Sequence, residues 1–313
     1  MIDMEPGITA FAYGMEDYIR EVAKKDTESD IGIWSKKEGE RIVTYLTATR
    51  YPEKLSSLTD AMYPADFVLL PPAVKPDRNM AEVMVAASLS GKPALVYAPD
   101  GSDMDTFRNY ARAAGLKVSS VLQGSPMEVQ AQVLEMKSPP KPEGPTTVIV
   151  DHFFTVRSVG TVALGFVLRG TLRRHQRLKV SHVKREVQVR SIQVHDIDQE
   201  EVPPGTRVGV ALKNIETEEL RRGGALLTEG DVEYAVEFSD IRYHPAVRER
   251  LRDGQEVFAM ESMQYQRGFF SGSVRLDREI AVVKRKVLFG HPNMSPRVAG
   301  TLDLGHAPAL SLD

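Results

Sequence analysis

The chain has 313 residues, no cysteine, 42% hydrophobic and 27% charged residues, and a formal net charge of −3. This composition suits a globular protein of two or three domains and excludes disulfides, thiolate metal sites and cysteine nucleophiles. No apolar run approaches the ~18 residues that a membrane-spanning helix needs. The acidic N-terminus lacks a secretory pattern, so we expect a cytoplasmic protein with no membrane partner.

The charge is unevenly distributed along the chain. Residues 1–145 carry 16 basic and 21 acidic side chains, residues 146–229 carry 13 and 10, and residues 230–313 carry 11 and 12. The middle part is therefore the basic one, and we expect a polyanionic partner to bind there.

The first part of the chain alternates between strand and helix patterns. Short apolar runs typical of buried strands occur at residues 8–13, 66–70 and 94–97, and helical patterns occur at residues 15–23, 79–89 and 105–114. Strands that alternate with helices predict a mostly parallel sheet in a layered α/β domain.

A proline-rich segment separates this part from the rest. Residues 138–145 contain four prolines in eight positions, which is typical of a semi-rigid linker. After it, the hydrophobic pattern has a period of two, with glycine or Pro-Gly between the runs, which predicts a small barrel or sandwich. Strand patterns continue beyond a second boundary that we expect near Glu229-Gly230-Asp231. We predict domains at residues 1–137, 146–229 and 230–313, joined first by the linker 138–145.

Four segments of the middle part occur in an order and at a spacing that match those of a known protein domain. They are DHFFTVRSVGTV (151–162), GFVLRG (165–170), PGTRVGV (204–210) and ELRRGGALL (219–227). With them, residues 147–230 resemble domain II of the translational GTPases of the elongation factor Tu group. The DHFF opening is most similar to the selenocysteine-specific elongation factor SelB, and residues 236–274 resemble that factor's domain III. The resemblance implies a multidomain α/β plus all-β fold, with a P-loop-type G domain followed by two β-barrels.

The phosphate-binding motif of a G domain is not present after the first strand. A P-loop has the pattern G-x-x-x-x-G-K-[ST], whose amides, lysine and hydroxyl hold phosphates and magnesium. This sequence has Ala12-Tyr13-Gly14-Met15-Glu16-Asp17, with one glycine and no lysine or hydroxyl. Glu16 and Asp17 would repel a triphosphate at that place.

The other GTPase motifs also differ from the family pattern. Arg50 and Lys54 replace the aspartate and histidine of the family's D-x-P-G-H, and residues 98–103 replace N-K-x-D. Asp100 or Asp103 could still contact a base, with helix capping as the alternative. We predict a degenerate G domain that is not a GTPase and needs no cofactor, with GTP binding in an atypical pocket as the remaining alternative.

The resemblance also implies a binding pocket in the first barrel. In the family, domain II holds the tRNA acceptor end and its aminoacyl group. The matching positions place Asp151 and Phe154 at the pocket wall and Arg207 on an adjoining strand. His152 and Arg157 complete the candidate set. We expect Arg157 to lie on the same strand face as Thr155. Barrel packing and turn capping are the alternative roles.

Basic residues crowd two hairpins of the same predicted barrel. A phosphate-contacting face is one reading, and a solvated hairpin surface is the other. The phosphate-contact candidates are Arg169, Arg173, Arg174, Arg177, Lys179, Lys184 and Arg185. The seven histidines show no metal-ligand spacing, so we expect no metal site.

Together, these patterns predict a protein that acts in translation. We expect a relative of elongation factor Tu or SelB that has lost the GTPase motifs and binds tRNA or a ribosomal component without a nucleotide-driven switch. Two alternatives stay open: a protein–protein scaffold or regulatory module that uses the barrels, and an atypical GTP-binding elongation factor.

Overall fold

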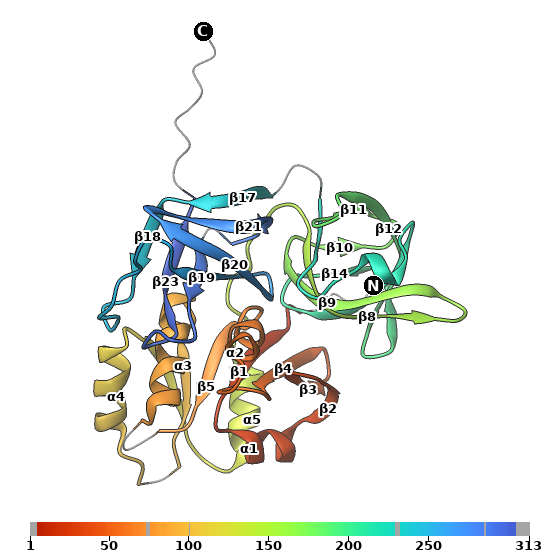
Figure 1. Cartoon of the computed structure of the whole chain (residues 1–313). Coiled ribbons are helices and arrows are strands. Elements are labelled where there is room, and N and C mark those ends of the chain that lie inside the picture. The colour runs from red at the N-terminus through yellow and green to blue at the C-terminus, as the bar shows by residue number, and fades with distance from the viewer. Residues whose placement is uncertain (1–4, 73–75, 100, 229–231, 285, 305–313) are drawn as a thin grey trace.

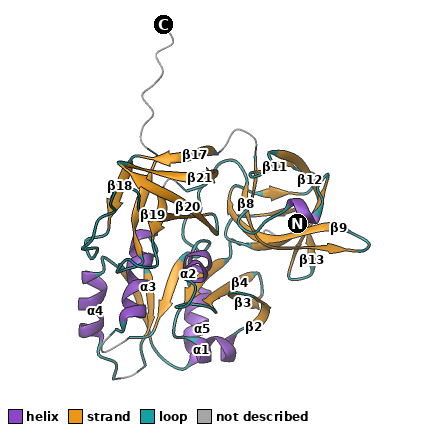
Figure 2. Ribbon diagram, in the orientation of Figure 1, coloured by secondary structure: helices purple, strands orange, loops and turns teal. Residues whose placement is uncertain are grey.

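The computed structural model describes residues 5–72, 76–99, 101–228, 232–284 and 286–304. Three seven-stranded sheets follow one another along the chain, and the five α-helices of the described residues all flank the first sheet (Figure 1). Figure 2 separates this helix-bearing part from two parts built almost entirely of strands. Among the described residues, no helix is both long and apolar enough to cross a membrane.

The first sheet belongs to an α/β domain, which runs from β1 to α5. Five strands, in the order β4-β1-β5-β6-β7, are parallel, whereas β3 and β2 continue the sheet antiparallel beyond β4. The elements are β1 (Ile8–Ala12), α1 (Glu16–Val22), β2 (Lys24–Glu28), β3 (Ile31–Glu38), β4 (Arg41–Ala48), α2 (Leu55–Met62), β5 (Phe67–Leu70), α3 (Arg78–Leu89), β6 (Ala94–Tyr97), α4 (Met104–Ala113), β7 (Val118–Leu122) and α5 (Pro126–Glu135). The mostly parallel sheet is confirmed, but the antiparallel strands were not predicted.

Alternating side chains of the strands pack into two hydrophobic cores, one on each face of the sheet. On β5, Phe67 and Leu69 pack with α1 and α5, while Val68 and Leu70 pack with α2, α3 and α4. Asp103 caps α4, because its Oδ1 accepts the Thr106 N–H at 3.0 Å. Asp103 therefore has the helix-capping role that was the alternative to contact with a base. Asp100 lies outside the described residues.

The second sheet forms the first barrel, from β8 to β16. Its order is β11-β16-β8-β9-β15-β12-β13, and β11 also pairs with β12, which brings the two ends together. The elements are β8 (Thr147–Val156), β9 (Gly160–Arg169), β10 (Leu172–Arg173), β11 (Arg177–Val180), β12 (Arg185–Val194), β13 (Ile197–Gln199), β14 (Glu201–Val202), β15 (Arg207–Lys213), the 3-10 helix η1 (Thr217–Glu219) and β16 (Ala225–Leu227). Valine, leucine and isoleucine fill its core.

The third sheet forms the second barrel, from β17 to β23, in the order β17-β21-β20-β19-β22-β23-β18. Its strands are β17 (Glu233–Phe238), β18 (Asp240–Tyr243), β19 (Glu256–Glu261), β20 (Gln264–Ser271), β21 (Ser273–Val282), β22 (Lys286–Gly290) and β23 (Val298–Asp303). An α/β domain followed by two barrel-like β domains is the predicted fold class. The boundary predicted at residues 229–231 lies outside the described residues.

Buried polar contacts join the three parts. Glu82 on α3 accepts bonds from the Arg297 guanidinium of the second barrel at 2.6–3.1 Å, and Tyr63 donates to Glu261 at 2.9 Å. Arg222 of the first barrel contacts Asp30 and Asp60 of the α/β domain. Each barrel is therefore fixed to the α/β domain by charged side chains.

Gly165 on β9 lies where the first barrel has no room for a side chain. It pairs with Val150 of β8 and with Val208 of β15. A Cβ at this position would lie well under 3.0 Å from the Ile149 carbonyl oxygen, which is closer than real Cβ atoms come. The strands around Gly165 must move apart to accept any other residue.

We expect Gly165→Ala to lower the free energy of unfolding by about 1–3 kcal/mol, because the overlap is with backbone that cannot step aside. Urea unfolding measures the effect. Gly209→Ala on neighbouring β15 is the matched control, since its Cβ would meet Leu164 Cδ2 at an ordinary 3.4 Å. Equal stability of the two variants would contradict the packing argument.

Candidate binding site between the α/β domain and the first barrel

A buried ion pair forms the centre of the candidate site. Asp151 follows a register shift in β8, and its side chain is 0% exposed. Arg207 of β15 donates from Nε to Asp151 Oδ2 at 3.0 Å and from Nη2 to Oδ1 at 2.9 Å. His152 Nδ1 lies 2.6 Å from the same Oδ1. The guanidinium thus holds the carboxylate with two parallel bonds.

The surroundings of Asp151 keep its carboxylate ionised. Burial by itself would raise the pKa of Asp151, but the Arg207 charge and the hydrogen bonds from His152 and Arg207 hold the pKa below its usual value. The two opposite charges of the pair therefore balance each other, and Asp151 serves a structural role rather than that of a proton donor or acceptor. It can orient polar groups at the barrel surface.

The ion pair lies next to a cavity between the two domains. Arg207 also reaches across to the α/β domain, where its Nη2 lies 3.5 Å from Thr27 Oγ1 of β2. The cavity has a volume of about 530 Å³, and Arg207 and Phe154 both line it. Lys24, Lys25 and Asp26 of β2 form its opposite wall. The remaining lining includes Leu164, Gln193, His195 and Asp196. Charged groups and an aromatic ring face the same space.

The structure brings most of the predicted pocket residues together. Asp151, His152 and Arg207 form the cluster, and Phe154 lines the adjoining cavity with 43% of its surface exposed. Arg157 does not join them: β8 ends at Val156, so Arg157 lies exposed in the turn that leads to β9. The expectation that Arg157 shares the strand face of Thr155 is wrong for this reason.

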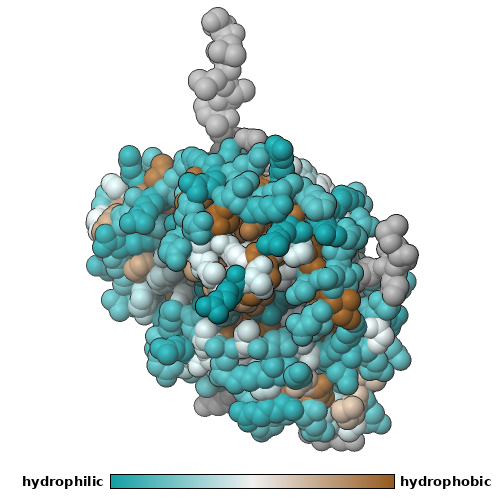
Figure 3. Space-filling model, turned by 90° about the vertical axis from the view of Figure 1, so that its right-hand side faces the viewer, coloured by the Kyte–Doolittle hydropathy of each residue, from teal (hydrophilic) through white to brown (hydrophobic). Residues whose placement is uncertain are grey.

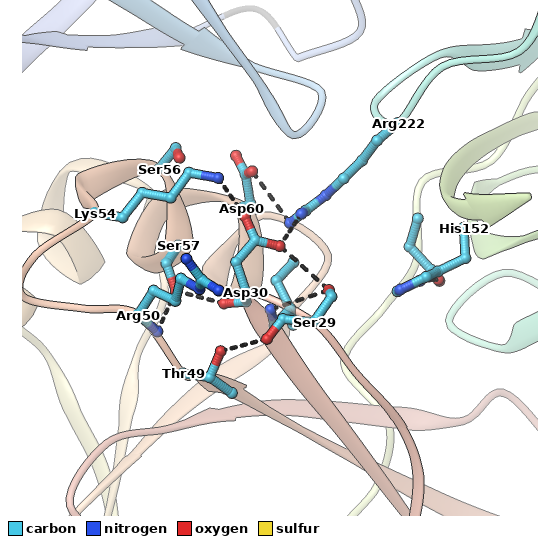
Figure 4. A network of polar contacts seen from close by, with 12 residues as sticks. Ser29, Asp30, Thr49, Arg50, Lys54, Ser56, Ser57, Asp60, His152 and Arg222 are labelled. Carbon is cyan, nitrogen blue, oxygen red and sulfur yellow. Dashed lines mark hydrogen bonds and ion pairs between the residues drawn. The ribbon is translucent and has the colours of Figure 1, made fainter.

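A second polar network crosses the same domain interface (Figure 4). Arg222 of the first barrel reaches Asp30 between β2 and β3, and its Nη2 lies 3.2 Å from Asp60 Oδ2 on α2. Lys54 Nζ pairs with Asp30 Oδ2 at 2.7 Å. The sequence analysis did not identify this network, since Asp30 and Asp60 belong to no motif and Arg222 was noted only as part of the segment ELRRGGALL (219–227).

The two carboxylates of this network differ in their ionisation. Burial would raise the pKa of Asp30, but its bonds and charge interactions with Lys54 and Arg222 bring that pKa down to about 2. Burial raises the pKa of Asp60 to about 7; the Arg222 charge opposes this rise and the Asp30 charge adds to it. The carboxylate that has fewer cationic contacts is therefore the one that titrates near neutrality.

The predicted phosphate contacts are largely occupied by acidic partners from the barrels. At least five of the seven form ion pairs: Arg173–Glu201, Arg174–Glu200, Arg177–Glu186, Lys184–Glu279 and Arg185–Glu219, at 2.6–3.3 Å. Arg169 donates to Thr147 Oγ1 at 3.3 Å, and Lys179 on β11 is half-buried. The excess positive charge of this region is thus partly neutralised within the surface.

Two tyrosines lie at the turn where a G domain would hold phosphates. The rings of Tyr13 and Tyr51 meet edge to face with their centroids 5.7 Å apart. Burial, together with the charges of Asp77, Glu16 and Glu82, raises the pKa of Tyr13. The acidic residues Glu16 and Asp17 occupy the first turn of α1. The surroundings of the β1–α1 turn are therefore aromatic and acidic.

Comparisons with known proteins agree with this architecture. The family model described as "Elongation factor Tu domain 2" matches residues 160–227. An uncharacterized protein of Methanocaldococcus jannaschii is 31% identical over 264 residues, which are 82% of this chain and 84% of that protein. The selenocysteine-specific elongation factor of the same organism is 37% identical over 87 residues, which are 28% of this chain and 18% of the factor.

The whole fold has a counterpart among solved structures. Translation elongation factor SelB of Methanococcus maripaludis, in complex with the GTP analogue GppNHp, superimposes with a TM-score of 0.76 at 16% identity, covering 97% of this chain and 80% of that one. An α/β domain with two following β-barrels, the first of the elongation factor type, defines the class of protein. The chain belongs to the translational GTPase-like superfamily, which includes elongation factor Tu and SelB.

We expect Arg207→Met to lower the free energy of unfolding by about 3–5 kcal/mol, because it leaves the buried Asp151 carboxylate without a cation. Asp151→Asn combined with Arg207→Met should cost less than the two single changes added together, since the double variant has no unpaired buried charge. Urea unfolding of the four proteins gives the coupling. Additive effects would mean that the pair does not interact.

Asp60→Asn should change how stability depends on pH. A carboxyl whose pKa is about 7 in the folded protein binds an extra proton relative to the unfolded chain, so its contribution destabilises the fold as pH rises from about 4 to 7. Relative to the parent, the variant should gain about 2–4 kcal/mol of stability over that range. Denaturant unfolding at several pH values tests this, with the exposed Asp17→Asn as the control that should show no such gain.

Proposed function

We propose that this chain is a translation factor that binds the acceptor end of a tRNA, or an equivalent ribosomal component, without a GTP-driven switch. The observation that carries the proposal is the cavity between the α/β domain and the first barrel, where Arg207 and Phe154 face β2. The related elongation factors act in translation, as their names state.

The shape and chemistry of this cavity suit the end of an acylated nucleotide. Phe154 offers an exposed aromatic face, on which bases stack in single-stranded nucleic acid recognition. Lys24 and Lys25 supply cations on the opposite wall, while Asp26 and the Asp151–Arg207 pair offer groups of both signs. A polar aminoacyl group would find partners there.

The β1–α1 turn supports the part of the proposal that concerns nucleotide. The Tyr51 hydroxyl lies 3.0 Å from Glu82 Oε1 and 3.0 Å from the Asn79 carbonyl oxygen, which fixes the ring beside Tyr13. A triphosphate at this turn would meet the ring pair and the carboxylates of α1 instead of a lysine and glycine amides. Lys54, at the position of the family's histidine, is bound to Asp30.

The surface on the side of the first barrel favours a polar partner over a protein partner that would dock on a scaffold. Seen from the side of the first barrel, the surface is mainly hydrophilic, with hydrophobic side chains in small separate patches (Figure 3). A large continuous apolar patch, where one occurs, marks a docking site for protein or membrane, and this face shows only small ones. The protein–protein alternative remains an outcome of the experiment below.

The test is binding of deacylated and aminoacylated tRNA to the full chain across a salt series, without nucleotide. We expect affinity to fall with salt, with a log–log slope of about −0.7 to −0.9 for each phosphate contact. Phe154→Ala should remove any preference for the acylated form, because it deletes an exposed wall of the cavity without opening the core. Adding GTP and magnesium should leave the affinity unchanged.

Lys117→Glu, an exposed change at the far side of the α/β domain, is the control and should bind like the parent. Charge reversal at Arg173 and Arg174 then asks whether the hairpins contribute. No binding at low salt would rule out the tRNA reading and favour the scaffold. Tight magnesium-dependent GTP binding, or GTP hydrolysis, would instead favour the atypical GTPase.

A further inference from the structure

A separate cavity lies between the α/β domain and the second barrel. It has a volume of about 350 Å³, which falls within the ~300–1,000 Å³ typical of small-molecule pockets. Helices α2 and α3 line one side, and β19 and β22 line the other. Its apolar walls come from Tyr63, Leu89, Met260, Met263 and Leu288. An aromatic or aliphatic group would fit against these side chains.

Three lysines from two domains face this cavity. They are Lys92, which follows α3, Lys284, which precedes β22, and Lys286 at the start of β22. The charge of Lys92 is close enough to Lys284 to lower the pKa of Lys284. Both also line a neighbouring cavity of about 590 Å³, so the two ammonium groups stand side by side in the wall between two spaces.

The two inner lysines are held in place by helix α2. Lys284 Nζ donates to the Tyr63 carbonyl oxygen at 2.5 Å and lies 3.8 Å from the centroid of the Tyr63 ring. Lys92 Nζ donates to the Ala65 carbonyl oxygen. The Tyr63 carbonyl is at the C-terminal cap of α2, where carbonyl groups favour cations, and Ala65 follows in the turn before β5. Each ammonium group has three N–H donors, so each can still donate to a further partner.

The nearby carboxylates are already committed to other partners. Glu261 Oε1 accepts the backbone N–H groups of Val283 and Lys284 and the Tyr63 hydroxyl, at 2.9–3.0 Å. Asp66 pairs with Lys141, and Asp60 is bound to Arg222. Burial lowers the pKa of Lys284 well below its usual range, and the adjacent Lys92 charge lowers it further, against the opposing charges of Glu261 and Asp66. The nearby carboxylates therefore do not balance the three lysines, and among the described residues the charged form of Lys284 lacks a partner of opposite charge bound directly to its ammonium group.

We propose that this cavity binds a small organic anion, with its carboxylate, phosphate or sulfonate group beside Lys92, Lys284 and Lys286 and its apolar body against Tyr63 and the two methionines. An anionic group at this point would favour the charged form of Lys284 and offset the repulsion between that charge and Lys92. Because the cavity walls come from two domains, the bound molecule also bridges the α/β domain and the second barrel.

The probe is anilinonaphthalene sulfonate, whose fluorescence rises in apolar surroundings, titrated into the full folded chain. N-phenylnaphthylamine has the same rings without the sulfonate and reports the apolar contribution alone. We expect saturable binding of the sulfonate dye at one site. Lys286→Glu, which alters an exposed residue at the mouth, should weaken it about tenfold or more, as should Lys92→Met.

Lys213→Glu carries the same charge change at the exposed end of β15, in the first barrel, which contributes no residue to the lining of this cavity, and should leave the affinity unchanged. Lys286→Glu keeps the test valid if Lys92→Met does not fold, since Lys286 is exposed and makes no capping bond. Failure of the sulfonate dye to bind, equal binding of both dyes, or an unchanged affinity in Lys286→Glu would overturn the proposal.

Discussion

Charged side chains that are buried only when the domains touch determine the arrangement of this molecule. Glu82 is 3% exposed and is neutralised by Arg297, a residue of another domain 215 positions later in the chain. Removing one partner of such a buried pair costs about 3–5 kcal/mol, whereas most surface ion pairs contribute less than about 1 kcal/mol. The two candidate binding cavities depend on this arrangement, because each takes its walls from two domains.

Local sequence patterns predicted the elements whose side chains pack into cores. Val68 and Leu70 alternate with Phe67 and Leu69 between two hydrophobic layers, so β5 is visible as a continuous apolar run. By contrast, β2 is a charged edge strand with the sequence KKDTE, and no apolar period marks it. Its position comes from pairing with β3, which a reading of local patterns does not include.

The candidate site was predictable only as far as the resemblance reached. Asp151 and Arg207 are 56 residues apart, and only their place in a known type of barrel indicated that they meet. Thr27 and Arg222 reach across a domain interface, so their contacts depend on docking geometry that no motif encodes. The count of basic residues also overstated the free positive charge, because Arg185 and Glu219, for example, are far apart in sequence and adjacent in space.

The connection between α1 and β2 is a single residue, Ala23. A segment this short leaves the backbone between α1 and β2 no alternative path. The connection therefore fixes where β2 begins relative to α1, and with it the position of Lys24 and Lys25, which line the cavity facing the first barrel. Since Arg222 and Arg297 anchor different barrels, each barrel has its own set of charged contacts to this domain. The wall of the cavity that β2 supplies is thus set by the α/β domain itself and not by the docking of either barrel.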